Sequence, residues 1–410
     1  MSNIRHLNKH INTYGVDKNL FTAAFMVLFF VIFDGIGMYL APIVMQNHGV
    51  AIGQIGLIIG LSSVAGMLFD IVLGRLIENN TYKTIFLFML LIAAIYPFFL
   101  FGSNTITMYL IAMAIWGLYY NLYNIGALDF VGDIENKDKH TSSFGVLKVF
   151  DGLGYLIAPF LASIFLIYLS LKDISYYMLM ILIPAFIFYF ILCKMKHPLV
   201  INKTNTKNLY SILTEVKIWD KIGHILLPIL LLTLTINLVD SAIWTIGPIF
   251  SESLHLKNNF SGGAFMLAYT LPPLLVGWIV GRFVARYGKK KVALYALLLG
   301  SILVTFVGLV TNPLLAIAII FGTSFCFALA WPSINAAYAD DIAAKTEHSK
   351  ELENVEDLFT NIGDTLGPIL GGYAAQFLTV SHAFIAIGIF GVLAAGILLL
   401  YIPDNLVLRV

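Results

Sequence analysis

The chain has 410 residues, of which 59% are hydrophobic and only 11% are charged, and its mean hydropathy is +0.88. Soluble domains carry roughly 25% charged residues, so this chain has too few charges to cover a water-exposed surface. The net charge of +1 gives no general attraction to nucleic acid. The composition therefore indicates an integral membrane protein.

Twelve apolar segments are long enough to cross a bilayer, which requires about 20 residues per helix. They lie near residues 20–45, 52–77, 84–101, 106–131, 143–169, 175–193, 222–250, 261–283, 291–310, 314–338, 354–379 and 382–402. The first segment is too long for a signal-peptide core, so we expect it to remain in the mature protein. The polar stretch 194–221 predicts a linker between an N-terminal bundle, 1–193, and a C-terminal bundle, 222–410.

Lysine and arginine predict the orientation, because they concentrate in cytoplasmic loops. With both termini in the cytoplasm, all basic residues except Lys172 and Lys257 fall on the cytoplasmic side. The short loops favour a prokaryotic inner membrane.

The two groups of six segments repeat each other at a spacing of 206 to 209 residues. Asp34 precedes Pro42 by eight residues, and Asp240 precedes Pro248 by the same interval. The other matches, in the same order along the chain, pair 74–83 with 281–290, Asp133 with Asp341, and 154–159 with 363–368. Parallel repeats of this kind are typical of one transporter architecture.

On these residues the chain resembles the major facilitator superfamily over nearly all of its length. The family signature Gly-x-Leu-x-Asp-Arg-x-Gly-Arg-Lys follows the second helix of each half. The first copy here lacks the arginine after the acid, and the second lacks the acid. Residues in or beside the two copies are Gly74, Arg75, Glu78 and Lys83, and Gly281, Arg282, Arg286 and Lys290.

A second family signature, typical of antiporters, reads Gly-x-x-x-Gly-Pro-x-x-Gly-Gly. It is complete at 363–372, in the eleventh segment, whereas antiporters usually carry it in the fifth, where this chain keeps only parts of it. The resemblance implies an all-α fold of two pseudo-symmetric six-helix bundles and transport by alternating access. It also implies that the protein acts as a monomer without a cofactor.

Asp34 and Asp240 are the leading candidates for function, because a charge near the bilayer centre is costly and is retained for a purpose. The resemblance places the first, fourth, seventh and tenth helices around a central cavity. Helical spacing groups further candidates with these acids: Asn237, Trp244, Tyr120, Asn121, Asn124, Trp331, Asn335 and Tyr338, with Asp364 on the eleventh helix.

The sign of these charges limits the substrate. No lysine or arginine lies in the middle of the four cavity helices, so a multivalent anion would find no cationic partner. We expect the carboxylates to bind a proton, a cationic substrate, or the two in competition. The alternative is that each aspartate only stabilises packing within its half.

The resemblance also suggests gating contacts between the halves. Arg75 would meet Asp357, and Arg282 would meet Asp151, near the cytoplasmic ends. Alternatively, both arginines only reach the lipid headgroups, and Asp151 pairs with Lys148 three residues before it. The full set of gating candidates is Gly74, Arg75, Glu78, Lys83, Asp133, Asp151, Arg282, Arg286, Lys290 and Asp357.

Three function classes were compared. Secondary transport is favoured, with proton-coupled export of a cationic or amphipathic compound ahead of proton-coupled uptake or facilitated transport of a neutral sugar or nucleoside. A transport-dead scaffold or sensor is the alternative from another class. An enzyme is disfavoured, because no hydrolase, metalloprotease or phosphate-binding motif occurs.

Overall fold

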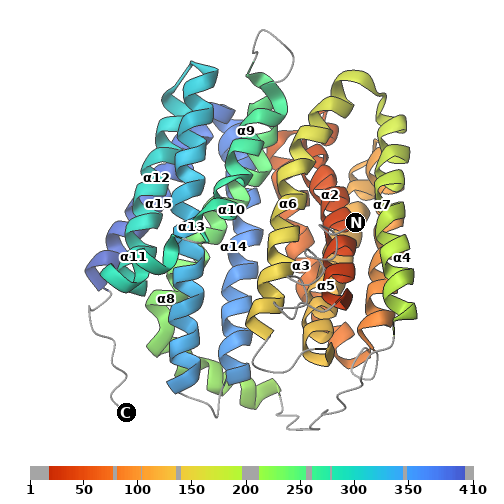
Figure 1. Ribbon diagram of the computed structural model, residues 1–410. Helices are drawn as coiled ribbons and strands as arrows, with labels where there is room; N and C mark the ends of the chain where they lie inside the picture. The colour runs from red at the N-terminus through yellow and green to blue at the C-terminus, as the bar shows by residue number, and fades with distance from the viewer. Residues whose placement is uncertain are drawn as a thin grey trace, which may run out of the picture.

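The computed structural model describes residues 18–76, 81–102, 104–134, 140–195, 212–254, 261–277, 279–344 and 349–401. Within these ranges only the backbone is described at 70–76, 133–134, 141, 212–225, 261–262, 339–344, 349–354 and 401. Every described element is an α-helix, and the helices form two bundles side by side, drawn from red to yellow-green and from green to blue (Figure 1).

The N-terminal bundle contains the six expected helices. They are α2 (Lys18–Asn47), α3 (Ile52–Leu76), α4 (Tyr82–Phe101), α5 (Ile106–Ile134), α6 (His140–Tyr168) and α7 (Leu171–Lys194). Each lies within a few residues of its predicted segment, so the sequence assignment of this half is confirmed.

The C-terminal bundle departs from the prediction in two places. It contains α8 (Ile212–Ser253), α9 (Ser261–Thr270), α10 (Pro272–Val276), α11 (Val280–Tyr287), α12 (Lys289–Leu309), α13 (Pro313–Ala344), α14 (Ser349–Phe377) and α15 (Val380–Tyr401). Helix α8 begins ten residues before the expected 222, inside the predicted linker. The eighth predicted span is broken into α9, α10 and α11, with a bend of 66° before Val280.

Local chemistry explains the interruption between α9 and α10, because Pro272 and Pro273 lack the amide hydrogens that a continuous helix needs. The 66° bend lies farther on, between Val276 and Val280. Ten helices in the described ranges are long and apolar enough to cross a membrane, or eleven if the broken helix counts as one span. Helix α14, which corresponds to the eleventh predicted span, is not among them, and its first turns are rich in charged residues. The chain is therefore a multi-pass membrane protein.

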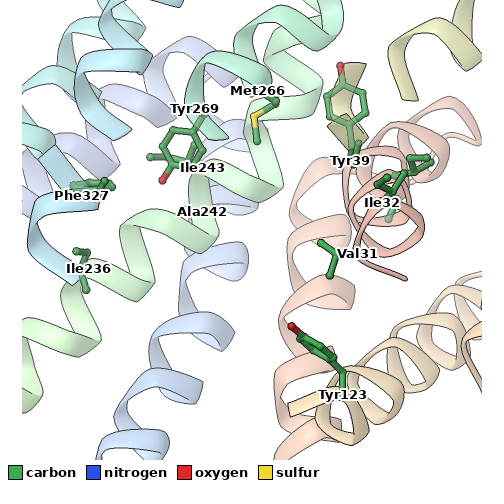
Figure 2. Packing of buried hydrophobic residues seen from close by; sticks show 14 of the residues in the cluster. Val31, Ile32, Tyr39, Tyr123, Ile236, Ala242, Ile243, Met266, Tyr269 and Phe327 are labelled. Carbon is green, nitrogen blue, oxygen red and sulfur yellow. The ribbon is translucent and has the colours of Figure 1, made fainter. Parts of the chain in front are cut away.

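Each bundle has its own apolar core around one central helix, α2 or α8. Figure 2 shows Val31, Tyr39 and Tyr123 on the N-terminal side, and Ile243 and Tyr269 on the C-terminal side. The two central helices carry Asp34 and Asp240.

The repeat is visible in how these central helices pack. In the first half α6 approaches α2 so closely that a Cβ on Gly154 would lie 2.8 Å from Val31 Cβ. In the second half α14 approaches α8, and a Cβ on Gly363 would lie 2.8 Å from Leu234 O. Small residues of the Gly-Pro signature thus allow close contact between the helices that hold the two aspartates.

The same signature also joins the two halves. A Cβ on Gly263 of α9 would come within 2.6 Å of the carbonyl oxygen of Pro159 on α6. At the symmetric position Gly56 of α3 lies against the carbonyl of Pro368 on α14. The two interfaces between the bundles are therefore equivalent under the repeat.

Two side-chain hydrogen bonds join the bundles at one end of the described structure. We call it the Gly49 end, where α2 ends and α3 begins, the upper end in Figure 1. There the Tyr39 hydroxyl donates to Glu252 Oε1 at 2.8 Å, and the Gly53 amide donates to Gln376 Oε1 at 2.9 Å.

The opposite end, near Lys148 on α6, has looser surroundings. A Cβ added at Gly132, Gly145 or Gly281 would meet no atom within 4 Å. The halves are thus closed against each other at the Gly49 end.

Candidate functional site

Asp34 is fully buried and accepts three hydrogen bonds from aromatic side chains. Trp116 Nε1 and the Tyr119 hydroxyl donate to Oδ1 at 2.7 and 2.8 Å, and the Tyr155 hydroxyl donates to Oδ2 at 2.8 Å. All three donors come from the N-terminal bundle. They hold the carboxyl group in one orientation and satisfy much of its hydrogen-bonding capacity.

None of these three donors was among the predicted site residues. The prediction took Tyr120 and Asn124 as the inward face of α5, whereas Trp116 and Tyr119 face Asp34. The i, i+3 spacing of Trp116 and Tyr119 indicates that they share one face of the helix. The sequence does not show how the helix is rotated about its axis, and therefore which face points to Asp34. Tyr120 still lies beside the site, with its ring centroid 6.2 Å from that of Trp116. Asn124 is exposed.

Asp240 has a different environment from Asp34. Its Oδ1 accepts a hydrogen bond from the hydroxyl of Tyr269 on α9, and no other donor to it appears among the described residues. Tyr269 was also missed from the sequence, because it lies on the broken eighth span. Its backbone carbonyl in turn accepts a hydrogen bond from Ser324 on α13.

Asp364 occupies the position in the second half that Tyr155 occupies in the first. Each residue directly follows the first glycine of its copy of the Gly-Pro signature. The residue that would donate a hydrogen bond to the aspartate is thus replaced by a second acid. Asp364 is half-buried and lies within range of the charge of Asp240. The second half therefore contains an acid pair, Asp240 and Asp364, in place of a carboxylate enclosed by donors.

Three aromatic rings connect the two acidic centres. The centroid of Tyr155 lies 6.1 Å from that of Trp244, and the centroid of Trp244 lies 6.1 Å from that of Tyr269. Since Tyr155 binds Asp34 and Tyr269 binds Asp240, these rings form a bridge from one half to the other. The structure thus brings Asp34, Asp240 and Trp244 together, as expected.

The predicted asparagines are less involved in the site. The Asn121 side chain donates to Gly66 O at 2.6 Å, and the Asn237 side chain donates to Thr233 O at 2.8 Å. Both amides therefore bind backbone between or within helices. Asn335 is exposed.

The predicted aromatic residues of α13 lie at different depths. Tyr338 is buried, with its hydroxyl 3.2 Å from Thr233 Oγ1. Trp331 is half-buried against the core.

The expected pair between Arg282 and Asp151 is not formed. Asp151 instead binds Lys148 at 3.1 Å and accepts a hydrogen bond from the Tyr123 hydroxyl at 3.0 Å, while Arg282 is exposed. The three-residue spacing on α6 brings Lys148 to Asp151, and α11 is bent away from the preceding helix, so the local pair forms.

The other gating candidates make local contacts or lie outside the description. Lys83 donates to Cys193 O at 3.2 Å, the Arg286 guanidinium lies 5.4 Å from the Tyr287 ring centroid, and Lys290 is half-buried. Asp357 and Gly281 are exposed. The side chains of Gly74, Arg75, Glu78 and Asp133 lie outside the described residues, so the Arg75–Asp357 contact stays a prediction.

Comparison with known proteins shows which family and which relatives this chain resembles. A sequence profile of the Major Facilitator Superfamily matches residues 20–350. The curated relative Multidrug resistance protein 2 of Bacillus subtilis (strain 168) is 30% identical over 132 residues, which are 32% of this chain and 32% of the relative. The match thus spans about a third of that protein's length.

Two solved structures share the fold at low sequence identity. The nucleoside transporter NupG superposes with a TM-score of 0.74 at 13% identity, over 94% of this chain and 99% of NupG. A bacterial homologue of the human lysosomal transporter Spinster, in an inward-facing and occupied conformation, gives a TM-score of 0.73 at 12% identity, over 93% of this chain and 95% of the homologue.

Proposed function

This chain belongs to the Major Facilitator Superfamily, and on that premise we propose that it exports cationic or amphipathic small molecules in exchange for protons. The observation that carries the proposal is the acid pair. Asp364 lies within range of the charge of Asp240, and the Tyr269 hydroxyl donates a hydrogen bond to Asp240.

No cation balances this pair within the described residues. The salt bridge between Lys148 and Asp151 involves neither acid. Two like charges in a site of low dielectric constant repel strongly, so the pair favours taking up either a proton or a cationic group. A site that binds one or the other supports exchange of the two.

The aromatic bridge suits an organic cation. Tyr155, Trp244 and Tyr269 present ring faces and edges between the acidic centres, and a cation over such a ring gains about 0.5–2 kcal/mol. The name of the B. subtilis relative agrees with a substrate of this kind.

Proton-coupled uptake or facilitated transport of a neutral sugar or nucleoside is the second candidate. It rested on the asparagine, tyrosine and tryptophan side chains expected around the cavity. The structure favours it less, since the Asn121 and Asn237 amides bind backbone carbonyls.

The placement of the protein in its membrane is part of the proposal. The distribution of lysine and arginine supports cytoplasmic termini in a prokaryotic inner membrane. The Gly49 end then faces outward and the Lys148 end faces the cytoplasm. We propose further that the chain acts as a monomer and is not an enzyme. Its two bundles are proposed to span 1–193 and 222–410, with the linker between them.

Proton release by purified protein in detergent tests this function. Aromatic cations (tetraphenylphosphonium, ethidium) and neutral solutes (uridine, glucose) are added to weakly buffered protein, and the change in pH is recorded. We expect a cation to release protons from the wild type, and the release to be lost in Asp240→Asn and Asp364→Asn. Asp173→Asn, an exposed aspartate at the start of α7, is the matched control.

Binding of a cation without proton release would overturn proton exchange. Binding of uridine or glucose, with no response to either cation, would instead support the second candidate.

A further inference from the structure

A row of polar side chains extends from the acidic centre along α5 and α6 toward the Lys148 end. On α6, Lys148, Asp151 and Tyr155 follow at successive turns, and on α5, Tyr120 and Tyr123 are three residues apart. Seven residues of α-helix separate Lys148 from Tyr155, a rise of about 10 Å. The row therefore covers the distance between the buried centre and the bundle surface near Lys148.

The side chains of this row lie near one another. Beside Tyr155, which binds Asp34, lies Tyr120, which is in electrostatic range of Asp34, Asp151 and Asp364. The rings of Tyr120 and Tyr123 have centroids 6.0 Å apart.

At the outer part of the row, the Tyr123 hydroxyl donates to Asp151 Oδ1 at 3.0 Å. Asp151 Oδ2 binds Lys148, whose side chain is 67% exposed, while that of Asp151 is 12% exposed. The row thus begins beside Asp34, which is fully buried, and ends at Asp151, which binds the exposed Lys148.

The C-terminal half has no equivalent. At the repeat positions of Tyr120 and Tyr123 stand Ala328 and Trp331, and at that of Asp151 stands Thr360. The hydroxyl row is a feature of one half alone, so neither the fold nor the repeat explains it.

We propose that Tyr120, Tyr123 and Asp151 form a proton route between the central carboxyl groups and the Lys148 end. The inference rests on the proposed proton exchange and adds a path to it. Tyrosine hydroxyls suit this task because each can accept a proton on its oxygen while it gives up its own.

The transfer is balanced at every step. A central carboxyl group gives its proton to the Tyr120 oxygen as the Tyr120 proton passes to Tyr123 and the Tyr123 proton passes to Asp151 Oδ1. Both tyrosines are neutral before and after the transfer. Asp151 then releases the proton to water beside Lys148, and rotation of the hydroxyls restores the starting arrangement.

The groups that face this route come from three helices. Asp34 of α2 and Asp364 of α14 stand at its inner end, and Lys148 of α6 stands at its outer end. Tyr119 and Tyr155 also contact Asp34, and we assign them to holding that carboxylate.

The test measures how fast the central carboxyl groups lose a proton, without any substrate. Wild-type protein is stepped from acid to alkaline pH, and the infrared absorption of protonated carboxyl groups is followed in time. Bands that disappear in Asp34→Asn, Asp240→Asn or Asp364→Asn identify the central acids. The variants Tyr120→Phe and Tyr123→Phe remove one hydroxyl each, with Tyr189→Phe, a buried tyrosine of α7, as the control.

We expect Tyr120→Phe and Tyr123→Phe to slow the loss of the central bands by about tenfold or more. In Tyr123→Phe the midpoint of the titration should not move, because only the path has changed. Imidazole added to the buffer should restore part of the rate by carrying protons itself. A purely structural role for the hydroxyls would not produce this rescue.

Two results would overturn the route. One is an unchanged rate in both variants, with central bands present. The other is a slowed rate that Tyr189→Phe reproduces or that imidazole does not raise. If no central carboxyl group titrates in the wild type, the proposed proton exchange fails as well, so the two failures are distinguishable.

Discussion

Tyr155 and Trp244 meet across the two halves of the molecule, with ring centroids 6.1 Å apart and planes inclined by 59°. The same tyrosine donates its hydroxyl to Asp34. A rearrangement of the halves must therefore change the surroundings of a residue that holds a buried carboxylate. This contact links the position of the bundles to the chemistry of the site.

Substitution of Trp244 tests the aromatic bridge. Trp244→Ala removes the ring between Tyr155 and Tyr269, and loss of an aromatic contact of about 1–2 kcal/mol weakens binding of an aromatic cation roughly tenfold. Trp244→Phe keeps a ring and should retain most of the affinity. Equilibrium binding to purified protein measures both, and equal affinities in the two variants would show that the ring plays no part.

Asp34 and Asp364 should respond differently to the same substitution. Asp34→Asn places an amide where a carboxylate accepts three donors, so at least one hydroxyl loses its acceptor and stability falls by about 1–3 kcal/mol. Asp364 makes no side-chain hydrogen bond within the described residues, so Asp364→Asn loses none and relieves repulsion with Asp240, and thermal stability should hold or rise. Thermal unfolding in detergent measures both, and a larger loss in Asp364→Asn would refute the assignment.

The hydrogen bond between Tyr39 and Glu252 should hold the Gly49 end closed. Tyr39→Phe removes a bond worth about 1–2 kcal/mol, which raises the fraction open at this end roughly tenfold. Spin labels at Asn47 and Ser253, both exposed at that end, report the distance between the halves.

The control for this variant is Tyr109→Phe, because the Tyr109 hydroxyl binds His48 within one half. An equal change of the distance distribution in both variants would mean that the Tyr39 contact has no special part in closure.

Close packing between the halves predicts a sensitive glycine. A Cβ at Gly372 would lie 2.7 Å from Ile52 O, so Gly372→Ala forces α3 and α14 apart and costs about 1–3 kcal/mol. Gly145→Ala in α6 is the matched control, because its Cβ would meet nothing within 4 Å. Thermal unfolding should separate the two variants, and equal unfolding temperatures would contradict the packing.

Much of the fold could be predicted from the sequence, because spans of apolar residues and short loops carry the information directly. The repeat also identified Asp34 and Asp240 correctly as partners on equivalent helices. Proline at 272 and 273 marked the broken helix, but the length of the apolar segment outweighed that signal. The start of α8 was misplaced because charged residues, among them Glu215, Lys217, Asp220 and Lys221, interrupt the apolar residues before 222.

The contacts of the site were less predictable. Whether Tyr119 or Tyr120 faces Asp34 depends on the rotation of α5, which is fixed by packing against α2 and α4. The sequence could not show that Asp151 pairs with Lys148 and not with Arg282, because that choice depends on where α11 bends. Tyr269 could be recognised as a donor to Asp240 only once the position of α9 was known. The sequence shows that Asp364 occupies the position of Tyr155 in the second half. That a hydrogen-bond donor is thereby replaced by an acid became clear only from the structure, which places Tyr155 at Asp34.

The pH dependence of cation binding tests the central claim most directly. The dissociation constant of a panel cation that binds the wild type is measured at several pH values, alongside Asp240→Asn and Asp364→Asn. If the cation displaces one proton from the acid pair, its affinity falls by about tenfold for each unit by which the pH is lowered, within the range where the pair titrates. The dependence should flatten in both variants. An affinity that is independent of pH in the wild type would contradict exchange at this pair.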